Sequence, residues 1–370
     1  MNALLMLEDG FYLFGKTFAG SGEVFGEAVF NTAMNGYQEI ITDPSSTEQL
    51  LCFTYPHIGN YGCRPADNES SKPAAAAVIV KHYCREPQSI EATESLADML
   101  NRNGVIGLED LDTRTLTIHL RQKGAMRGVI STEILEPGIL LEKLKKYCKK
   151  SSAESLKEIS NNSPYIWKQA GRDEVAVFAP PEHSETLKEV VLLDFGVTFS
   201  MIKALNARGC LVRVLAPETS AETIKKLNPR GVFLGSGPHN PLIYEDYLPT
   251  VRSLAGWKPI MGIGMGHILL GMALGMDTYK MSFGHRGVNQ PVKEVESGRV
   301  LITKQNHGYN LKKSKTMPEN MEITHINLND NTIEGIANKD LRCISTQFYP
   351  DTGFGPQHCK NIYEYFTEII

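Results

Sequence analysis

The 370-residue sequence lacks several features that would assign it to a familiar class. It has no apolar run of the ~18 residues that a membrane span requires, and the longest runs cover only residues 74–80 and 268–276. No basic segment precedes the first apolar residues, so we expect no signal peptide. The seven cysteines form no Cys-x-x-Cys pair, which predicts no metal site and is typical of a reducing cytoplasm.

Charge and composition exclude further classes. The formal net charge is -4, so there is no electrostatic reason to expect a nucleic-acid partner. No Gly-x-x-x-x-Gly-Lys-Ser/Thr loop is present, so we expect no ATP bound through such a loop. Hydrophobic residues at 42% and charged residues at 22% describe a soluble globular protein, and the length predicts two domains.

The pattern of elements predicts the domain division. Residues 1–150 are rich in strands, with a hairpin around Asp9-Gly10 and helices over 89–100 and from Asp112 to Gly124. Residues 151–189 have the polar, irregular composition of a linker, although the segment 165–167 and the segment 175–178 could pack on a neighbour.

Residues 190–370 alternate short apolar strands with amphipathic helices. Strands are predicted at 190–194, 211–215, 231–234 and 259–263, with helices at 200–208, 221–227, 244–254 and 265–275. This alternation predicts an α/β domain with a mostly parallel sheet that is covered on both faces. Sites in such sheets lie at the carboxyl ends of the strands, so we expect three loops to converge there: Asp194-Phe-Gly196, Gly237-Pro-His-Asn-Pro241 and the turn at Gly264.

The turn at Gly264 is the most informative of these loops. It joins a predicted strand to a predicted helix and contains glycines at 262, 264 and 266. Several enzyme families hold a reactive side chain on such a strained strand-to-helix turn, close to helix amides that stabilise an oxyanion. Glycine is also the usual residue of any tight turn. The segment by itself leaves both interpretations open.

The turn resembles the Gly-Ile-Cys-Leu-Gly-His-Gln turn of class I glutamine amidotransferases. The whole chain resembles the small (glutaminase) subunit of carbamoyl phosphate synthetase. Five further blocks carry this resemblance: residues 30–45 (FNTAMNGYQEIITDPS), 54–60 (TYPHIGN), 112–117 (DTRTLT), 283–291 (FGHRGVNQP) and 305–309 (QNHGY). The resemblance implies a strand-rich amino-terminal domain at 1–150 and an amidotransferase domain at 190–370.

By resemblance, part of a glutamine pocket is retained. Ser45 matches a serine that reaches the pocket from the first domain, and the backbone amides of Gly237 and Met265 match an oxyanion hole. The amino-acid end of glutamine would contact Asn306, Gly308 and Tyr309. From the residues alone, Asn306-His-Gly308 could equally be a tight surface turn, and Ser45 could be a turn residue after Asp43-Pro44.

The catalytic residues of the family are missing. Its cysteine nucleophile is Gly264 here, and its His-Pro-Glu is Tyr349-Pro350-Asp351. Amide hydrolysis needs a nucleophile, a base within hydrogen-bond reach and a group that orients the base. Tyrosine, with a pKa near 10, is a poor general base at neutral pH. The pocket glutamine is replaced by Ile268, and a loop glycine is replaced by His239.

Three other residues are candidates to replace the missing catalytic groups. His267 sits beside Gly264, but the family has the same histidine beside its cysteine, so we interpret it as structural. The neighbours of Cys343 predict burial, and Cys359 has no helix amino terminus or basic neighbour to activate it. We therefore expect no intact catalytic triad.

Three hypotheses follow. The first is a cytoplasmic, non-hydrolysing small subunit that pairs with a large synthetase subunit. That partner would carry ATP and Mg²⁺ and make carbamoyl phosphate from ammonia for arginine or pyrimidine biosynthesis. The second is a working glutaminase with an unrecognised nucleophile. The third is a binding module that senses L-glutamine or another small amide.

Overall fold

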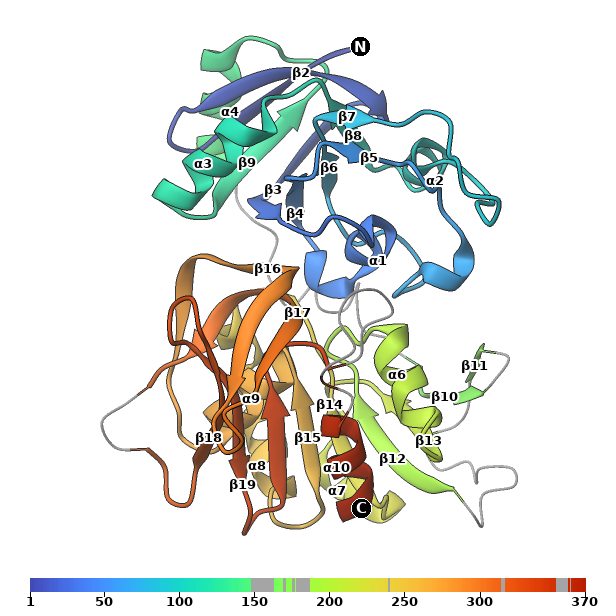
Figure 1. Cartoon of the computed structure of the whole chain (residues 1–370), viewed down its shortest axis with the longest axis vertical. Helices are drawn as coiled ribbons and strands as arrows, with labels where there is room; N and C mark the ends of the chain where they lie inside the picture. The colour runs from blue at the N-terminus through green and yellow to red at the C-terminus, as the bar shows by residue number, and fades with distance from the viewer. Residues whose placement is uncertain are drawn as a thin grey trace. The chain divides into compact units, whose positions relative to one another are not determined.

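A computed structural model of the chain describes residues 1–147, 163–168, 171–174, 177, 187–238, 240–313, 317–350, 359 and 361–370. The chain divides into two compact units, coloured along the sequence in Figure 1. The first comprises Met1–Lys149 and Met281–Val288, and the second comprises Lys150–Lys280 and Asn289–Ile370. The sequence assigned all of 190–370 to one domain, and it did not indicate that 281–288 belongs with the first unit.

The first unit is built on a closed barrel in the order β1-β2-β8-β6-β4-β3-β9. Its strands are β1 (Asn2–Leu7), β2 (Tyr12–Ala19), β3 (Glu23–Asn31), β4 (Gln49–Phe53), β6 (Ala77–Ile79), β8 (Ile106–Glu109) and β9 (Met126–Ser131). The predicted hairpin joins β1 to β2, with Gly10 at a φ of 90° in the turn. Two further strands, β5 (His57–Ile58) and β7 (His82–Tyr83), form a separate two-stranded sheet.

Alternation along β1 explains why both of its faces are buried. Ala3, Leu5 and Leu7 join one apolar cluster with Leu116 and Leu120 of helix α3 (Thr113–Lys123). The intervening residues Leu4 and Met6 pack in a second cluster with Leu140 and Leu144 of helix α4 (Pro137–Lys146). Side chains of a strand point alternately to its two faces, so each face has its own helix.

The helices of the first unit are α1 (Tyr37–Thr42), α2 (Leu96–Arg102), α3 (Thr113–Lys123) and α4 (Pro137–Lys146), with 3-10 turns η1 (Pro44–Ser46) and η2 (Pro65–Asp67). The predicted N-cap of α3 is confirmed, since the Asp112 side chain accepts from the Thr115 N–H. The helix predicted at 89–100 begins later than expected, at Leu96. Ser95 and Asp98 form a capping box, which fixes the first turn of α2 at Leu96.

The segment 281–288 packs with the first unit through specific contacts. The Arg286 carbonyl accepts from the Thr32 N–H at 3.1 Å, and the Ser282 carbonyl accepts from the Ala125 N–H at 2.7 Å. The Phe283 ring lies 5.8 Å from the Phe30 ring. These partners lie far away in sequence, and local patterns give no sign of such pairings.

The second unit contains an 11-stranded sheet in the order β11-β10-β13-β12-β14-β15-β20-β19-β18-β16-β17. Strands β12 (Lys188–Leu193), β13 (Cys210–Leu215), β14 (Gly231–Leu234), β15 (Ile260–Ile263) and β20 (Cys343–Thr346) pair in parallel. The remaining strands are β10 (Tyr165–Lys168), β11 (Gly171–Glu174), β16 (Thr278–Glu294), β17 (Val300–Leu311), β18 (Glu322–Asn327) and β19 (Ile333–Asn338).

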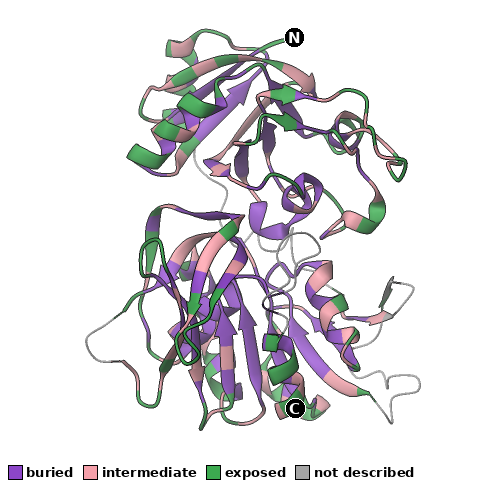
Figure 2. Cartoon of the chain, in the orientation of Figure 1, coloured by how far each residue is buried: buried purple, intermediate pink, exposed green. Residues whose placement is uncertain are grey.

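Helices cover both faces of the parallel part of this sheet, which confirms the predicted α/β class. Apolar residues of α7 (Ala221–Leu227), α8 (Leu248–Leu254) and α9 (Met265–Ala273) pack on Val191 and Leu193. Those of α6 (Phe199–Asn206) and α10 (Asn361–Ile369) pack on Val190 and Leu192. The central strands are buried along most of their length (Figure 2). A 3-10 helix, η3 (Pro241–Tyr247), precedes α8, so the α-helix predicted from 244 begins only at Leu248.

Part of the predicted linker belongs to the sheet. Tyr165 and Ile166 of β10 pair with Val214 and Arg213, and the Trp167 ring lies 4.8 Å from that of Phe199. The prediction that 165–167 packs on a neighbour is therefore confirmed, whereas 175–178 lies largely outside the described residues. Among the residues described, no helix is long and apolar enough to cross a membrane.

Candidate functional site

The turn between β15 and α9 has the strained backbone that the sequence predicted. Gly264 adopts φ 59° and ψ -112°, a conformation that residues with side chains rarely take. Its N–H donates to the Thr346 carbonyl at 2.9 Å, and its own carbonyl accepts from the Ile268 N–H at 3.3 Å. The strand-to-helix geometry that elsewhere presents a nucleophile is therefore present here without one.

The neighbouring glycines are needed for close backbone contact. A β-carbon at Gly266 would lie 2.1 Å from the Leu234 carbonyl oxygen, and one at Gly262 would lie 2.5 Å from the Gly266 carbonyl oxygen. Both distances are far inside van der Waals contact. Gly266 lets the turn pack on the end of β14, and Gly262 lets β15 lie close to the first turn of α9.

The three loops that the sequence placed at the carboxyl edge do converge. The Gly266 N–H donates to the Gly235 carbonyl at 3.0 Å, which joins the turn to the loop after β14. The Ser236 hydroxyl donates to the Gly196 carbonyl at 3.0 Å, which joins that loop to the loop after β12. Asp194 fixes the latter loop, because its Oδ1 accepts from the N–H groups of Gly196 and Val197.

Gly237 also lies in this convergent region. A β-carbon at Gly237 would lie 2.3 Å from the Phe195 carbonyl oxygen and 3.2 Å from the Tyr244 hydroxyl. The position is therefore restricted to glycine by packing alone. Its expected role in an oxyanion hole, together with the amide of Met265, stays a prediction. His239 and Asp351, two further positions named from the sequence, lie outside the described residues.

Tyr349, at the position where the resemblance implies a histidine base, lies against the turn. A β-carbon at Gly264 would be 3.3 Å from Cε1 of Tyr349 and 3.2 Å from Cβ of Ser236. The Tyr349 side chain is 1% exposed, and its backbone N–H donates to the Lys304 carbonyl at 3.0 Å. The Lys304 ammonium nitrogen lies 5.2 Å from the centroid of the Tyr349 ring. The two positions that the resemblance implies for nucleophile and base are therefore adjacent, and they hold glycine and tyrosine.

Met265 and Ile268, on the first turn of α9, are both buried. Their side chains join the apolar cluster formed by α7, α8 and α9. Ile268 occupies the position where the resemblance implies a glutamine that contacts substrate. In this chain its side chain contributes to the core and offers no hydrogen bond.

Asn306, Gly308 and Tyr309 lie within strand β17, so the alternative of a tight surface turn is wrong. Both ring nitrogens of the intervening His307 are engaged, with the Tyr309 carbonyl oxygen and with Gln305 Oε1, each at 2.9 Å. The Gln305 amide nitrogen in turn donates to the buried Glu334 carboxylate at 3.0 Å. The segment is fixed by side-chain contacts, and its contact with glutamine stays a prediction.

Ser45 lies in the first unit, in the 3-10 turn η1. Its N–H donates to Oδ1 of Asp43 at 2.8 Å, and its carbonyl accepts from the Gln49 amide at 3.0 Å. The interpretation of Ser45 as a turn residue after Asp43-Pro44 is therefore right for its local structure. Its implied contact with glutamine stays a prediction.

Neither thiol near the carboxyl end is activated. Burial raises the pKa of the Cys343 thiol to about 12 and that of Cys359 to about 12, so both are protonated at neutral pH. His267 is fully buried, with Nδ1 at 2.9 Å from the Ser345 hydroxyl. Burial, aided by nearby His325, lowers the pKa of His267 to about 3, which agrees with a structural role.

Sequence reasoning missed two residues of this region. Ser236 borders the space of the absent side chain, and its place directly before the predicted site loop 237–241 was a usable signal. Lys304 contacts the Tyr349 ring from strand β17, and nothing in its local sequence indicates that contact.

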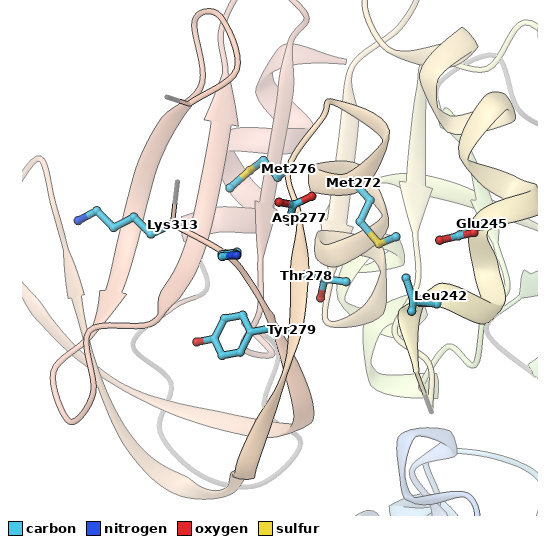
Figure 3. A pocket seen from close by; sticks show the side chains of 9 residues that line it. Leu242, Glu245, Met272, Met276, Asp277, Thr278, Tyr279 and Lys313 are labelled. Carbon is cyan, nitrogen blue, oxygen red and sulfur yellow. The ribbon is translucent and has the colours of Figure 1, made fainter. Parts of the chain in front are cut away.

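A surface pocket of about 700 Å³ lies at the other end of α9. Figure 3 shows Leu242, Glu245 and Met272 on one side of it and Tyr279 and Lys313 on the other. None of the residues predicted for the glutamine site lines this pocket, which is therefore separate from the turn at Gly264.

Comparison with known proteins covers nearly the whole chain. Residues 5–130 match the family described as carbamoyl-phosphate synthase small chain, CPSase domain, and residues 191–369 match glutamine amidotransferase class-I. The carbamoyl phosphate synthase small chain of Syntrophotalea carbinolica is 41% identical over 100% of this chain and 98% of its own. That of Solidesulfovibrio magneticus is 39% identical over the same shares. A solved glutamine amidotransferase from Thermotoga maritima is 15% identical, with a TM-score of 0.35 over 46% of this chain and 78% of its own.

Proposed function

Because the chain belongs to the carbamoyl phosphate synthase small-chain family, we propose that it is a small subunit that no longer hydrolyses glutamine. The observation that carries this proposal is the pairing of Gly264 with Tyr349 at the two positions where the family resemblance implies cysteine and histidine. Glycine offers no atom that could attack an amide, and a buried tyrosine is a poor base at neutral pH.

The size of the effect supports a complete loss of hydrolysis. Removing a nucleophile or base from such a catalytic unit costs roughly 10⁶ in turnover, and losses within one unit do not add. Once one member is gone, further changes at the others have little additional cost. The combined departures at Gly264, Ile268 and Tyr349 fit that expectation.

The rival proposal of an unrecognised nucleophile finds little support. Cys343 and Cys359 are buried thiols with raised pKa values. Ser236 borders the vacant position, but among the residues that the structure describes its hydroxyl donates to the Gly196 carbonyl and lies 3.8 Å from the Met201 sulfur. Neither the carbonyl nor the thioether can serve as a general base at neutral pH.

We further propose that the chain pairs with a large synthetase subunit that binds ATP and Mg²⁺ and takes free ammonia as its nitrogen source. The match of residues 5–130 to the small-chain domain supports this pairing. The product, carbamoyl phosphate, would feed arginine or pyrimidine biosynthesis in the cytoplasm. The six cysteines among the described residues are free thiols, which agrees with a reducing compartment.

The test compares nitrogen sources in the reconstituted complex of this chain with its large subunit. We expect carbamoyl phosphate synthesis with ammonium chloride and none above background with L-glutamine. Glutamate release by the purified chain, measured with and without the large subunit, should equal that of a heat-denatured control. Glutamine-dependent synthesis that persists in the Cys343→Ala and Cys359→Ala variants would refute the proposal.

A further inference from the structure

We infer that Tyr349 closes the remnant of the glutamine site, so that no carboxamide can reach the space beside Gly264. This closure rests on the proposed function, since it concerns a site that no longer breaks a bond. It also addresses the third hypothesis drawn from the sequence, a module that senses L-glutamine. A closed site cannot bind the amide end of glutamine in the manner of a glutaminase.

The space for a side chain at Gly264 is confined on two sides. A β-carbon there would lie 3.2 Å from Cβ of Ser236 and 3.3 Å from Cε1 of Tyr349. Carbon atoms in favourable contact are about 3.5–4.0 Å apart, so even this one atom would be crowded. The atoms of a longer side chain, or of a substrate carbonyl approaching within about 3–3.5 Å of it, need the volume that the tyrosine ring borders.

The tyrosine ring is held in place from several directions. The backbone of Tyr349 pairs with that of Lys304 through the 3.0 Å hydrogen bond. The Lys304 ammonium lies 5.2 Å from the ring centroid, and the two side chains are 3% and 1% exposed. A cation over an aromatic ring is attracted more strongly when both are removed from water. The ring also belongs to the apolar cluster of Met261, Ile263 and Phe348.

Ser236 borders the same space and is also fixed. It is fully buried, and its hydroxyl donates to the Gly196 carbonyl at 3.0 Å. Neither wall can therefore withdraw by a simple rotation of a free side chain. The closure predicts that the size of the ring, and not its hydroxyl group, keeps carboxamides out.

The test uses iodoacetamide, a small carboxamide that alkylates a cysteine at position 264 when it reaches the site. In this reaction the thiolate of an introduced cysteine forms a thioether and displaces iodide, which leaves as the anion. The labelling rate at position 264 is followed by peptide mass spectrometry in three full-length variants: Gly264→Cys alone, with Tyr349→Phe, and with Tyr349→Ala. We expect the Tyr349→Ala variant to be labelled at least tenfold faster than the other two.

The matched control combines Gly264→Cys with Tyr363→Ala. Tyr363 is also 1% exposed and belongs to the same apolar cluster, but it lies on α10. Slow labelling in this variant shows that the gain is specific to Tyr349, and labelling as fast as in the Tyr349→Ala variant would overturn the inference. Equal rates in Gly264→Cys with and without Tyr349→Ala would also overturn it, while leaving the proposed function intact. Hydrolysis of glutamine by the unaltered chain would instead refute the proposed function.

A second measurement applies if the cysteine variants fail to fold. Gly264→Ala should lower the melting temperature less in the Tyr349→Ala background than in the unaltered chain, because the ring that the new β-carbon meets is gone. With Tyr363→Ala as the background, the changes in melting temperature caused by Gly264→Ala and by Tyr363→Ala should be additive. Additive shifts in both backgrounds would contradict the closure by Tyr349.

Discussion

A β-carbon built on Gly264 would lie 3.3 Å from Cε1 of Tyr349, so these two residues are direct neighbours across the turn. By the family resemblance, they occupy the positions of the cysteine nucleophile and its histidine base. Because they are adjacent, the glycine at position 264 and the tyrosine at position 349 change the shape of the same small region. The missing side chain at position 264 leaves room for the tyrosine ring, and the ring in turn crowds any side chain that returns.

Repair of hydrolysis should require both positions. Gly264→Cys alone is expected to release glutamate only slowly, because its neighbour is a phenol instead of an imidazole that could lower the thiol pKa. Gly264→Cys with Tyr349→His should release glutamate at least ~100-fold faster than the single variant, the usual contribution of a general base. A coupled glutamate assay on both variants measures this.

Ile268→Gln, added to the double variant, should lower KM more than it raises kcat, since it restores a substrate contact. Activity in Gly264→Cys alone that matched the double variant would mean that another base is already in place. The role assigned to Tyr349 would then be wrong.

Stability should fall on acidification because of buried His267. Burial lowers its pKa to about 3 in the folded chain, whereas an unfolded histidine titrates near 6.5. Between these values only the unfolded state gains the proton. The contribution of His267 is therefore complete above pH 6.5 and decreases as the pH falls toward 3. The loss at pH 5 is about 2 kcal/mol, from about 1.4 kcal/mol per pH unit.

Urea unfolding at pH 7.5 and at pH 5 measures this loss. His267→Gln should reduce the difference between the two pH values, although the lowered pKa of His325, about 4, leaves a similar contribution in place. The exposed residue His57 provides the control, and His57→Gln should leave the difference unchanged. If His267→Gln left the difference in unfolding free energy between the two pH values unaltered, His267 would not be its source.

Close packing at the turn predicts that Gly266→Ala is severely destabilising. Its β-carbon would lie 2.1 Å from the Leu234 carbonyl oxygen, so the backbone of β14 or α9 must move. We expect the free energy of unfolding to fall by at least ~3 kcal/mol, which is the upper end of the usual cost of overpacking. Gly138→Ala is the control, because the nearest atom that a β-carbon there would meet in the described part of the chain is Glu136 Oε1 at 4.0 Å. The control should change the free energy of unfolding by at most about 1 kcal/mol. Denaturant unfolding of both variants measures these two changes, and equal losses of stability would contradict the prediction.

The chain should form a stable complex with the large synthetase subunit encoded in the same genome. Permanent interfaces of this kind bury ~2,000 Å² or more, so the complex should survive dilution and gel filtration. Co-expression followed by affinity purification through a tag on either chain tests this. Gly264→Cys should co-purify equally well, because the turn is buried within the second unit. Separation of the two chains at micromolar concentration would favour an independent binding module.

The fold class and the parallel part of the second unit could be predicted from the sequence. The strand–helix alternation after residue 187 follows the hydrophobic period, and α7 and β14 have the predicted bounds. The N-cap at Asp112 depends on a local hydrogen bond and was also correct. The start of α2 was wrong because residues 89–94 follow no capping signal, while the box formed by Ser95 and Asp98 determines the first turn.

The sequence by itself determined that position 264 has no nucleophile, because a missing side chain needs no structure to establish it. It also determined that three loops meet at one edge of the sheet, since parallel strands align their carboxyl ends. Only the tertiary structure decided that Tyr349 and Ser236 border the vacant position, that Lys304 lies over the tyrosine ring, and that 281–288 packs with the first unit. Local periodicity specifies which face of an element is buried. Which distant residue meets that face is fixed by the register and packing of the folded chain.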